Sequence, residues 1–89
     1  MKGRYLEVTF RKGRPLAAYL YLARKTGDRS LRTESVGPGL FVDYGTEGQP
    51  ICLEITAPDQ VTVDQINAVL KSLRLPPIKP EKLAPLQAA

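Results

Sequence analysis

Apolar and polar side chains alternate with a period of two residues along the first part of the chain. In residues 4–10, one side holds Leu6, Val8 and Phe10, which is typical of a half-buried β-strand. Residues 16–24 alternate in the same way after a short polar turn. Both sides of this second segment are fairly apolar, so it is predicted to be a central strand covered on both faces.

Three more strands are predicted in the middle of the chain. Residues 31–36 form a weaker candidate, which is delimited by turn residues on both sides. Residues 40–44 and 51–56 alternate clearly and surround a turn at residues 45–50 that contains two glycines. This arrangement indicates a β-hairpin.

Helical spacing replaces the period of two after Val61. Thr62 and Gln65 have the spacing of a capping box, in which each side chain accepts a hydrogen bond from a backbone N–H at the start of a helix. A helix is therefore predicted from Thr62 to about Arg74, where two nearby prolines end it. Its apolar stripe contains Val63, Ile66, Val69, Leu70 and Leu73.

A run of strands followed by one helix predicts an α+β fold. We expect a single domain over residues 1–89, with an antiparallel β-meander of four to five strands in residues 1–57. The helix, within residues 58–75, packs on one face, and residues 76–89 form a proline-rich tail with a possible turn at Pro80–Leu83. The predicted core contains the helix stripe and Leu6, Val8, Phe10, Leu20, Leu22, Val42 and Leu53.

Composition is that of an ordinary globular domain, but the charge is unevenly divided. Residues 1–35 hold nine Lys or Arg against three acids, whereas residues 36–61 hold four acids and no base. The whole chain has a net charge of +4. Such a division favours pairing of complementary surfaces.

Cellular location is predicted from what the sequence contains. No run of about 18 apolar residues is present and the first residues do not form a secretory signal, so a cytoplasmic protein without a membrane segment is expected. The one cysteine, Cys52, agrees with a reducing compartment. Its place in an apolar strand favours a packed thiol over a reactive one. No cofactor or metal site is predicted.

Several short motifs are similar to those of a known bacterial family. They are V-T-F, then A-A-Y-L-Y-L, then G-P-G-L-F-V-D-Y-G-T-E-G-Q-P-I-C-L-E-I-T, and they resemble the bacterial domain-of-unknown-function family 2283 over roughly Leu6 to Ala57. The residues on the family's positions are Phe10, Tyr19, Asp43, Tyr44, Gly48, Glu54 and Ile55. The resemblance implies a small β-sheet module with an antitoxin-like or partner-binding role. The basic turn at residues 11–14 and the long C-terminal segment depart from the family's pattern.

Strand alternation places Asp43 and Glu54 on one side of the sheet, near Cys52 and close to Tyr19 and Tyr21. Two carboxylates could act as acid and base or bind a hard metal ion, or they could accept hydrogen bonds that fix the strand register. A third interpretation is a recognition face, because tyrosine combines apolar area with a polar tip. The tyrosines could equally pack beneath the tail or a loop.

The turn at Arg11, Lys12 and Arg14 is the second candidate site. With Arg24, Lys25, Arg29 and Arg32 nearby it could contact phosphates. It could also bind an acidic protein, or simply protect the edge of the sheet.

The tail has the spacing of a polyproline ligand at Pro77–Pro80, or it packs across its own sheet or a second copy, anchored by Leu83 and Leu86. Taken together, these patterns favour a non-enzymatic protein-interaction module that forms a homodimer or binds a small protein encoded nearby. Its recognition face contains Tyr19, Tyr21, Asp43 and Glu54. The alternatives are a basic nucleic-acid-binding regulator that uses the 11–14 turn, and an enzyme that uses Asp43 and Glu54 in a concave pocket.

Overall fold

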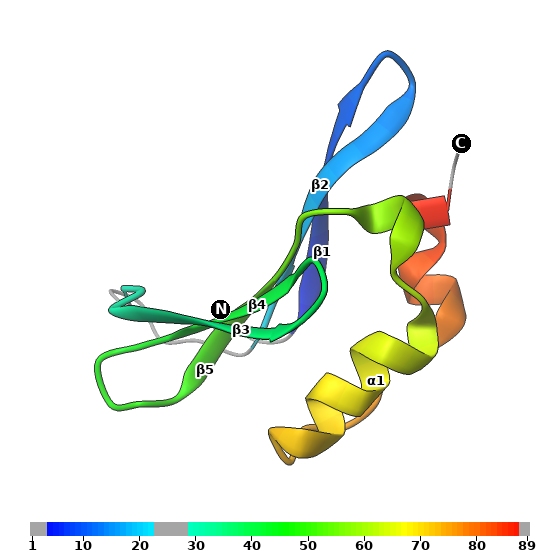
Figure 1. The fold of residues 1–89 in the computed structure, drawn as a ribbon. Helices are drawn as coiled ribbons and strands as arrows, with labels where there is room; N and C mark the ends of the chain where they lie inside the picture. The colour runs from blue at the N-terminus through cyan, green and yellow to red at the C-terminus, as the bar shows by residue number, and fades with distance from the viewer. Residues whose placement is uncertain (1–3, 23–28, 88–89) are drawn as a thin grey trace.

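The computed structural model describes residues 4–22 and 29–87, with the backbone alone for residues 86 and 87. The described strands form one antiparallel sheet in the order β1-β2-β5-β4-β3. They are β1 (Tyr5–Arg11), β2 (Arg14–Tyr21), β3 (Arg32–Gly37), β4 (Leu40–Tyr44) and β5 (Pro50–Ile55) (Figure 1). The predicted α+β class is confirmed. Strands β3, β4 and β5 follow each other as a meander, and the β1–β2 hairpin joins that meander through β5.

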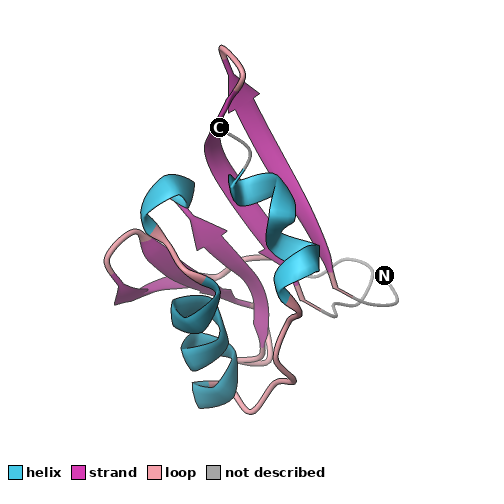
Figure 2. Ribbon diagram, turned by 90° about the vertical axis from the view of Figure 1, so that its right-hand side faces the viewer, coloured by secondary structure: helices cyan, strands magenta, loops and turns pink. Residues whose placement is uncertain are grey.

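The helical segments all lie on one side of the sheet (Figures 1 and 2). They are the 3-10 helices η1 (Pro58–Gln60) and η2 (Pro80–Gln87) and the α-helix α1 (Val63–Ser72). The predicted capping box is confirmed, because Gln65 N–H donates to Thr62 Oγ1 at 3.1 Å and Thr62 N–H donates to Gln65 Oε1 at 2.8 Å. The helix ends two residues earlier than predicted.

The core lies between the sheet and these helical segments. Leu20, Leu53 and Val42 are adjacent across β2, β5 and β4 because they are register partners, and none of them is exposed to solvent. Ile66 and Leu70 from α1 and Leu83 from the tail pack in the same cluster. Leu83 is only 1% exposed, so its predicted role as an anchor is confirmed. The side chain of Leu86, the second predicted anchor, lies outside the described residues.

Phe10 is not part of the core, although the sequence predicts it there. It is 48% exposed. The pairing of β1 with β2 shifts by one residue between Thr9 and Phe10, where Leu16 is left without a register partner. The end of the hairpin beyond this bulge projects past the helical segments (Figures 1 and 2). No described helix therefore covers Phe10.

The second strand also differs from its predicted form. It begins at Arg14 and its described part ends at Tyr21, and the predicted last residues, 23 and 24, lie outside the described residues. One face of β2 is buried at Ala18 and Leu20, but Tyr19 and Tyr21 on the other face are only half-buried. Coverage on both faces, as predicted, is therefore incomplete among the described residues.

The side chain of Asn67 links the tail to α1 through two hydrogen bonds. Its side-chain amide donates to the carbonyl of Ile78 at 3.2 Å, and its side-chain oxygen accepts from the N–H of Ile78 at 2.8 Å. Both backbone groups of Ile78 are satisfied by one side chain, and the Ile78 side chain is buried in the core. The tail thus packs across its own sheet, which was one of the predicted arrangements.

Candidate functional site

The sheet has a second face, turned away from α1 and η2, which we call the open face. Alternation along each strand assigns its residues, because neighbouring side chains point to opposite faces. None of the described helices lies on this side (Figure 2). The open face contains Tyr5, Glu7, Tyr19, Tyr21, Phe41, Asp43, Cys52 and Glu54.

Three tyrosines stack across β1 and β2 on the open face. The rings of Tyr5 and Tyr21 have centroids 4.7 Å apart, and those of Tyr19 and Tyr21 are 6.2 Å apart. The Tyr21 hydroxyl donates to Glu7 Oε1 at 3.1 Å. Burial, followed by this hydrogen bond to Glu7, raises the pKa of Tyr21 to about 12. The hydroxyl therefore remains a hydrogen-bond donor throughout the neutral range.

Two carboxyl groups meet in the middle of the open face. Asp43 on β4 is register partner of Cys52, and Glu54 is two residues further along β5, so the two acids are diagonal neighbours. The hydrogen bond to Asp43, then burial, then the charge of Asp43 raise the pKa of Glu54 to about 7. The hydroxyl of Thr33 on β3 donates to Asp43 Oδ1, and Asp43 is only 9% exposed. Below this pKa Glu54 keeps its proton, which avoids two adjacent negative charges.

Cys52 lies between the tyrosines and the carboxyl groups. Its register partners are Tyr21 on β2 and Asp43 on β4. It is 4% exposed, so the predicted packed thiol is confirmed.

The strand register brings together all four residues of the predicted recognition face. Tyr19 is opposite Glu54, and Tyr21 is separated from Asp43 by Cys52 alone. Sequence reasoning missed Tyr5, Glu7 and Phe41, which share this face. The same period of two places each of them on this face. The strand register shows that Tyr5 and Glu7 adjoin Tyr21 and Tyr19, and that Phe41 adjoins Glu54. Binding of a partner by this face stays a prediction.

The second predicted site is at the end of the β1–β2 hairpin. Lys12 and Gly13 form a two-residue turn, and both have positive φ values, 53° and 78°, as this tight turn requires. Arg11 and Arg14 are register partners on either side. The three basic residues, with Pro15 and Leu16, line a shallow cavity of about 430 Å³. The structure thus gathers Arg11, Lys12 and Arg14, with Leu16 half exposed beside them.

The other bases predicted near this turn do not all join it. Arg32 is on β3, the opposite edge of the sheet from β1, where it forms an ion pair with Glu34 at 3.2 Å and stacks over Tyr44. Arg24 and Lys25 lie outside the described residues. The basic hairpin end is therefore defined by residues 11–14.

Catalytic and metal-binding interpretations find little geometric support in the described part of the chain. Asp43 and Glu54 line neither of the two cavities that we describe. No three acidic or cysteine side chains among the described residues cluster as metal ligands would. The helices of the described part are too short or too polar to cross a membrane.

Comparison with known proteins gives no relative. No family model matches the chain, and neither a curated protein nor a solved structure matches it. The resemblance to family 2283 therefore stays a prediction that depends on the short motifs alone.

Proposed function

We propose that this protein is a non-enzymatic protein-interaction module that forms a homodimer through its open face. The observation that supports this proposal is the row of stacked tyrosines beside the carboxyl pair of buried Asp43 and half-buried Glu54, on a sheet face that no described helix covers. Tyrosine is enriched at protein interfaces because its ring supplies apolar area and its hydroxyl a hydrogen bond. Tyr5 is about half exposed, so the row offers ring area to a partner.

Charge complementarity supports a second copy of the chain as the partner. The open face carries the carboxyl groups of Glu7 and Glu54, and the chain's own basic hairpin end projects from the same sheet. In a two-fold dimer each hairpin end would lie on the open face of the other copy, so every contact would occur twice. A chain of this size buries a small core, and a self-association surface would add to its stability.

Size-exclusion chromatography with light scattering tests the homodimer. At tens of micromolar and low salt, we expect a mass near twice the 9.8 kDa of the chain, with dissociation favoured as salt screens the charges. The double variant Arg11→Glu, Arg14→Glu should be monomeric. Lys71→Glu, which changes the same charge on an exposed position of α1, should remain dimeric.

Two outcomes would count against this assembly. A wild-type chain that remains at 9.8 kDa under these conditions excludes the homodimer. A stable one-to-one complex with a different small protein, recovered on co-expression with its gene neighbours, would replace the second copy with an antitoxin-like partnership. Loss of that complex in Glu54→Lys would still assign binding to the open face.

A second candidate function is nucleic-acid binding by the basic hairpin end. The observation that favours it is the convergence of three cations at a projecting turn, with Phe10 exposed just before them. If all three contact phosphates, the affinity for duplex DNA should fall with salt at a slope of about −0.9 for each contact. A gel-shift series over salt concentration measures this slope. Unchanged binding after charge reversal at residues 11, 12 and 14 would exclude the idea.

A further inference from the structure

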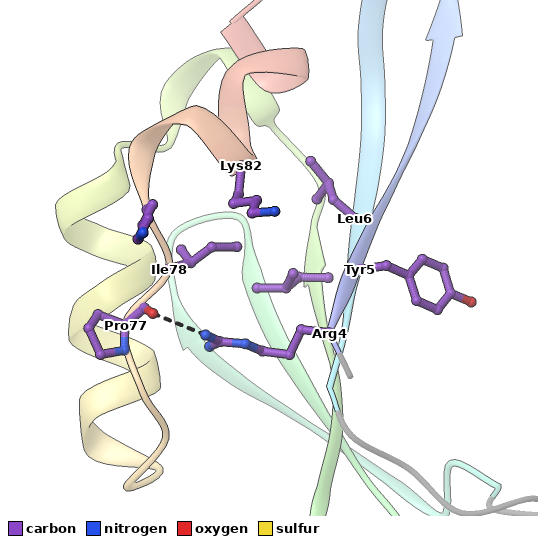
Figure 3. Close-up of a pocket in the computed structure, with 8 residues that line it drawn as sticks. Arg4, Tyr5, Leu6, Pro77, Ile78 and Lys82 are labelled. Carbon is purple, nitrogen blue, oxygen red and sulfur yellow. Dashed lines mark hydrogen bonds between the residues drawn. The ribbon is translucent and has the colours of Figure 1, made fainter. Parts of the chain in front are cut away.

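A second cavity lies on the covered side of the sheet, between β1, β2 and the proline-rich tail (Figure 3). Its volume is about 360 Å³, which is within the range of small-molecule sites. It is separate from the open face, because the ring of Tyr5 points away from it (Figure 3). The cavity is lined by Arg4, Tyr5, Leu6, Leu20, Pro77, Ile78, Lys79 and Lys82.

Three of the lining residues are cationic and none is acidic. Arg4 comes from the start of β1, and Lys79 and Lys82 come from the tail around the start of η2. The ammonium group of Lys82 is directed toward the β1 side of the cavity (Figure 3). Within the described residues, none of these three cations forms an ion pair. Their combined charge favours an anion.

Arg4 is held in place by backbone groups of the tail. Its guanidinium donates to the carbonyl oxygen of Pro76 and, at 3.0 Å, to that of Pro77. These two bonds use two of the five N–H donors of an arginine side chain. The carbonyls do not neutralise its charge. A fixed guanidinium loses less conformational entropy when an anion binds than a mobile one does.

The floor of the cavity is apolar. Leu20 is fully buried, Ile78 is nearly so, and Leu6 is half-buried. The apolar surface that remains exposed belongs to Leu6 and Pro77, and a purely inorganic anion would leave it without a partner. Burial of a hydrocarbon group against it adds a favourable free energy that grows with the apolar area removed from water.

From this arrangement we propose that the cavity binds a small organic carboxylate with a short hydrocarbon chain. The carboxylate pairs with Arg4, Lys79 and Lys82, and the hydrocarbon covers Leu6 and Pro77, close to Leu20 and Ile78. Recognition requires both parts of the ligand. The site does not depend on the proposed dimer, because the side chains that would bind the ligand are on the other side of the sheet from the tyrosine rings and the carboxyl pair.

Titration of the full chain with octanoate, followed by nuclear magnetic resonance of its methyl and amide groups, tests the proposal. Octanoate should give saturable shifts at Leu6, Leu20 and Ile78. Octan-1-ol, which has the same chain without the charge, and inorganic phosphate, which has charge without the chain, should each bind at least about tenfold more weakly. Equal binding of octanoate and octan-1-ol, or shifts that do not saturate, would overturn the proposal.

Charge-removing variants locate the anion. Lys79 and Lys82 are exposed. The substitutions Lys79→Gln and Lys82→Gln should each weaken octanoate binding about threefold or more. Lys71→Gln, outside the cavity on α1, should leave it unchanged. Arg4→Lys keeps the positive charge but loses the pair of hydrogen bonds to the carbonyls of Pro76 and Pro77. Because this loss could also destabilise the fold, the thermal midpoint of the variant is measured together with its affinity for octanoate. The proposed location would be refuted if both lysine variants bind octanoate as tightly as the wild type does. It would also be refuted if the chemical-shift changes centre on Tyr19 and Glu54.

Discussion

Glu54 has a raised pKa, chiefly because its carboxyl group is hydrogen-bonded to Asp43. The hydrogen bond to Asp43, burial and the charge of Asp43 all act in the same direction and raise its pKa to about 7. In the unfolded chain the same group has its ordinary pKa of 4.5. The folded protein therefore binds more protons than the unfolded chain between these two values, and the stability that this proton confers decreases as pH rises through that window.

The variant Glu54→Gln should remove this dependence, because its amide keeps a hydrogen-bond donor at every pH. We expect the thermal midpoint of the wild type to fall, relative to that of the variant, between about pH 5 and about pH 8. Thermal unfolding followed by circular dichroism at several pH values measures the midpoints of the wild type and of the variant.

Glu47→Gln serves as the control, because it removes the same charge from an exposed turn. Its midpoints should parallel those of the wild type. A wild-type curve that is parallel to that of Glu54→Gln across this range would contradict the raised pKa of Glu54.

At the scale of elements, the tail is part of the fold. Asn67 on α1 satisfies both backbone groups of Ile78, and Arg4 at the start of β1 binds two carbonyls further back in the tail. Leu83 fills the core from η2. Residues far apart in the sequence thus hold the tail in place against the rest of the fold.

Asn67→Ala should destabilise the protein by about 1–3 kcal/mol, because it leaves the partly buried N–H and carbonyl of Ile78 without partners. Urea unfolding measures the change in the free energy of unfolding. Lys71→Ala, an exposed change on the same helix, should stay within about 0.5 kcal/mol of the wild type. An Asn67→Ala protein as stable as Lys71→Ala would show that the tail is not fastened at this point.

The sequence predicts the individual strands and the helix better than it predicts which strands lie side by side in the sheet. Periods of two and of 3.6 residues identify the strands and α1, and the capping box places the start of the helix at Thr62. Phe10 was misplaced because a bulge does not appear in the alternation. The pairing of β2 with β5 was not predicted either, since alternation assigns a face to each side chain but does not say which strand lies beside it. Asp43 and Glu54 belong to one predicted hairpin, so the sequence brings them together. Tyr5 and Glu7 reach the site only through β2, so alternation alone does not find them, whereas the register of the hairpin would have found Phe41 opposite Glu54.

At the scale of the whole molecule, the sheet has a protected centre and two unequal edges. β5 has a strand on each side and an almost fully buried sequence, whereas every residue of β3 except Gly37 is exposed. Regions with few buried contacts open at lower free energy than the core. Local stability should therefore decrease from β5 toward β3 and toward the basic hairpin end.

Native-state hydrogen exchange tests this gradient. Hydrogen-bonded amides of β5 should exchange roughly tenfold or more slowly than those of β3, and the slowest of them should approach the rate set by global unfolding. Arg11 to Arg14 should exchange fastest among the described strand ends. Equal protection of β3 and β5 would mean that something shelters the outer edge, such as a strand from another molecule.

The strand order also has a consequence for biosynthesis. The edge of β2 opposite β1 is completed only by β5, which is made well after it, and α1 and the tail, which cover the face that holds Leu20, are made later still. Pairings between distant parts of a chain form slowly. When only the first hairpin has emerged from the ribosome, β2 exposes an unpaired edge that can pair with other chains. The nascent chain would therefore need either rapid completion of translation or a chaperone to shield this edge.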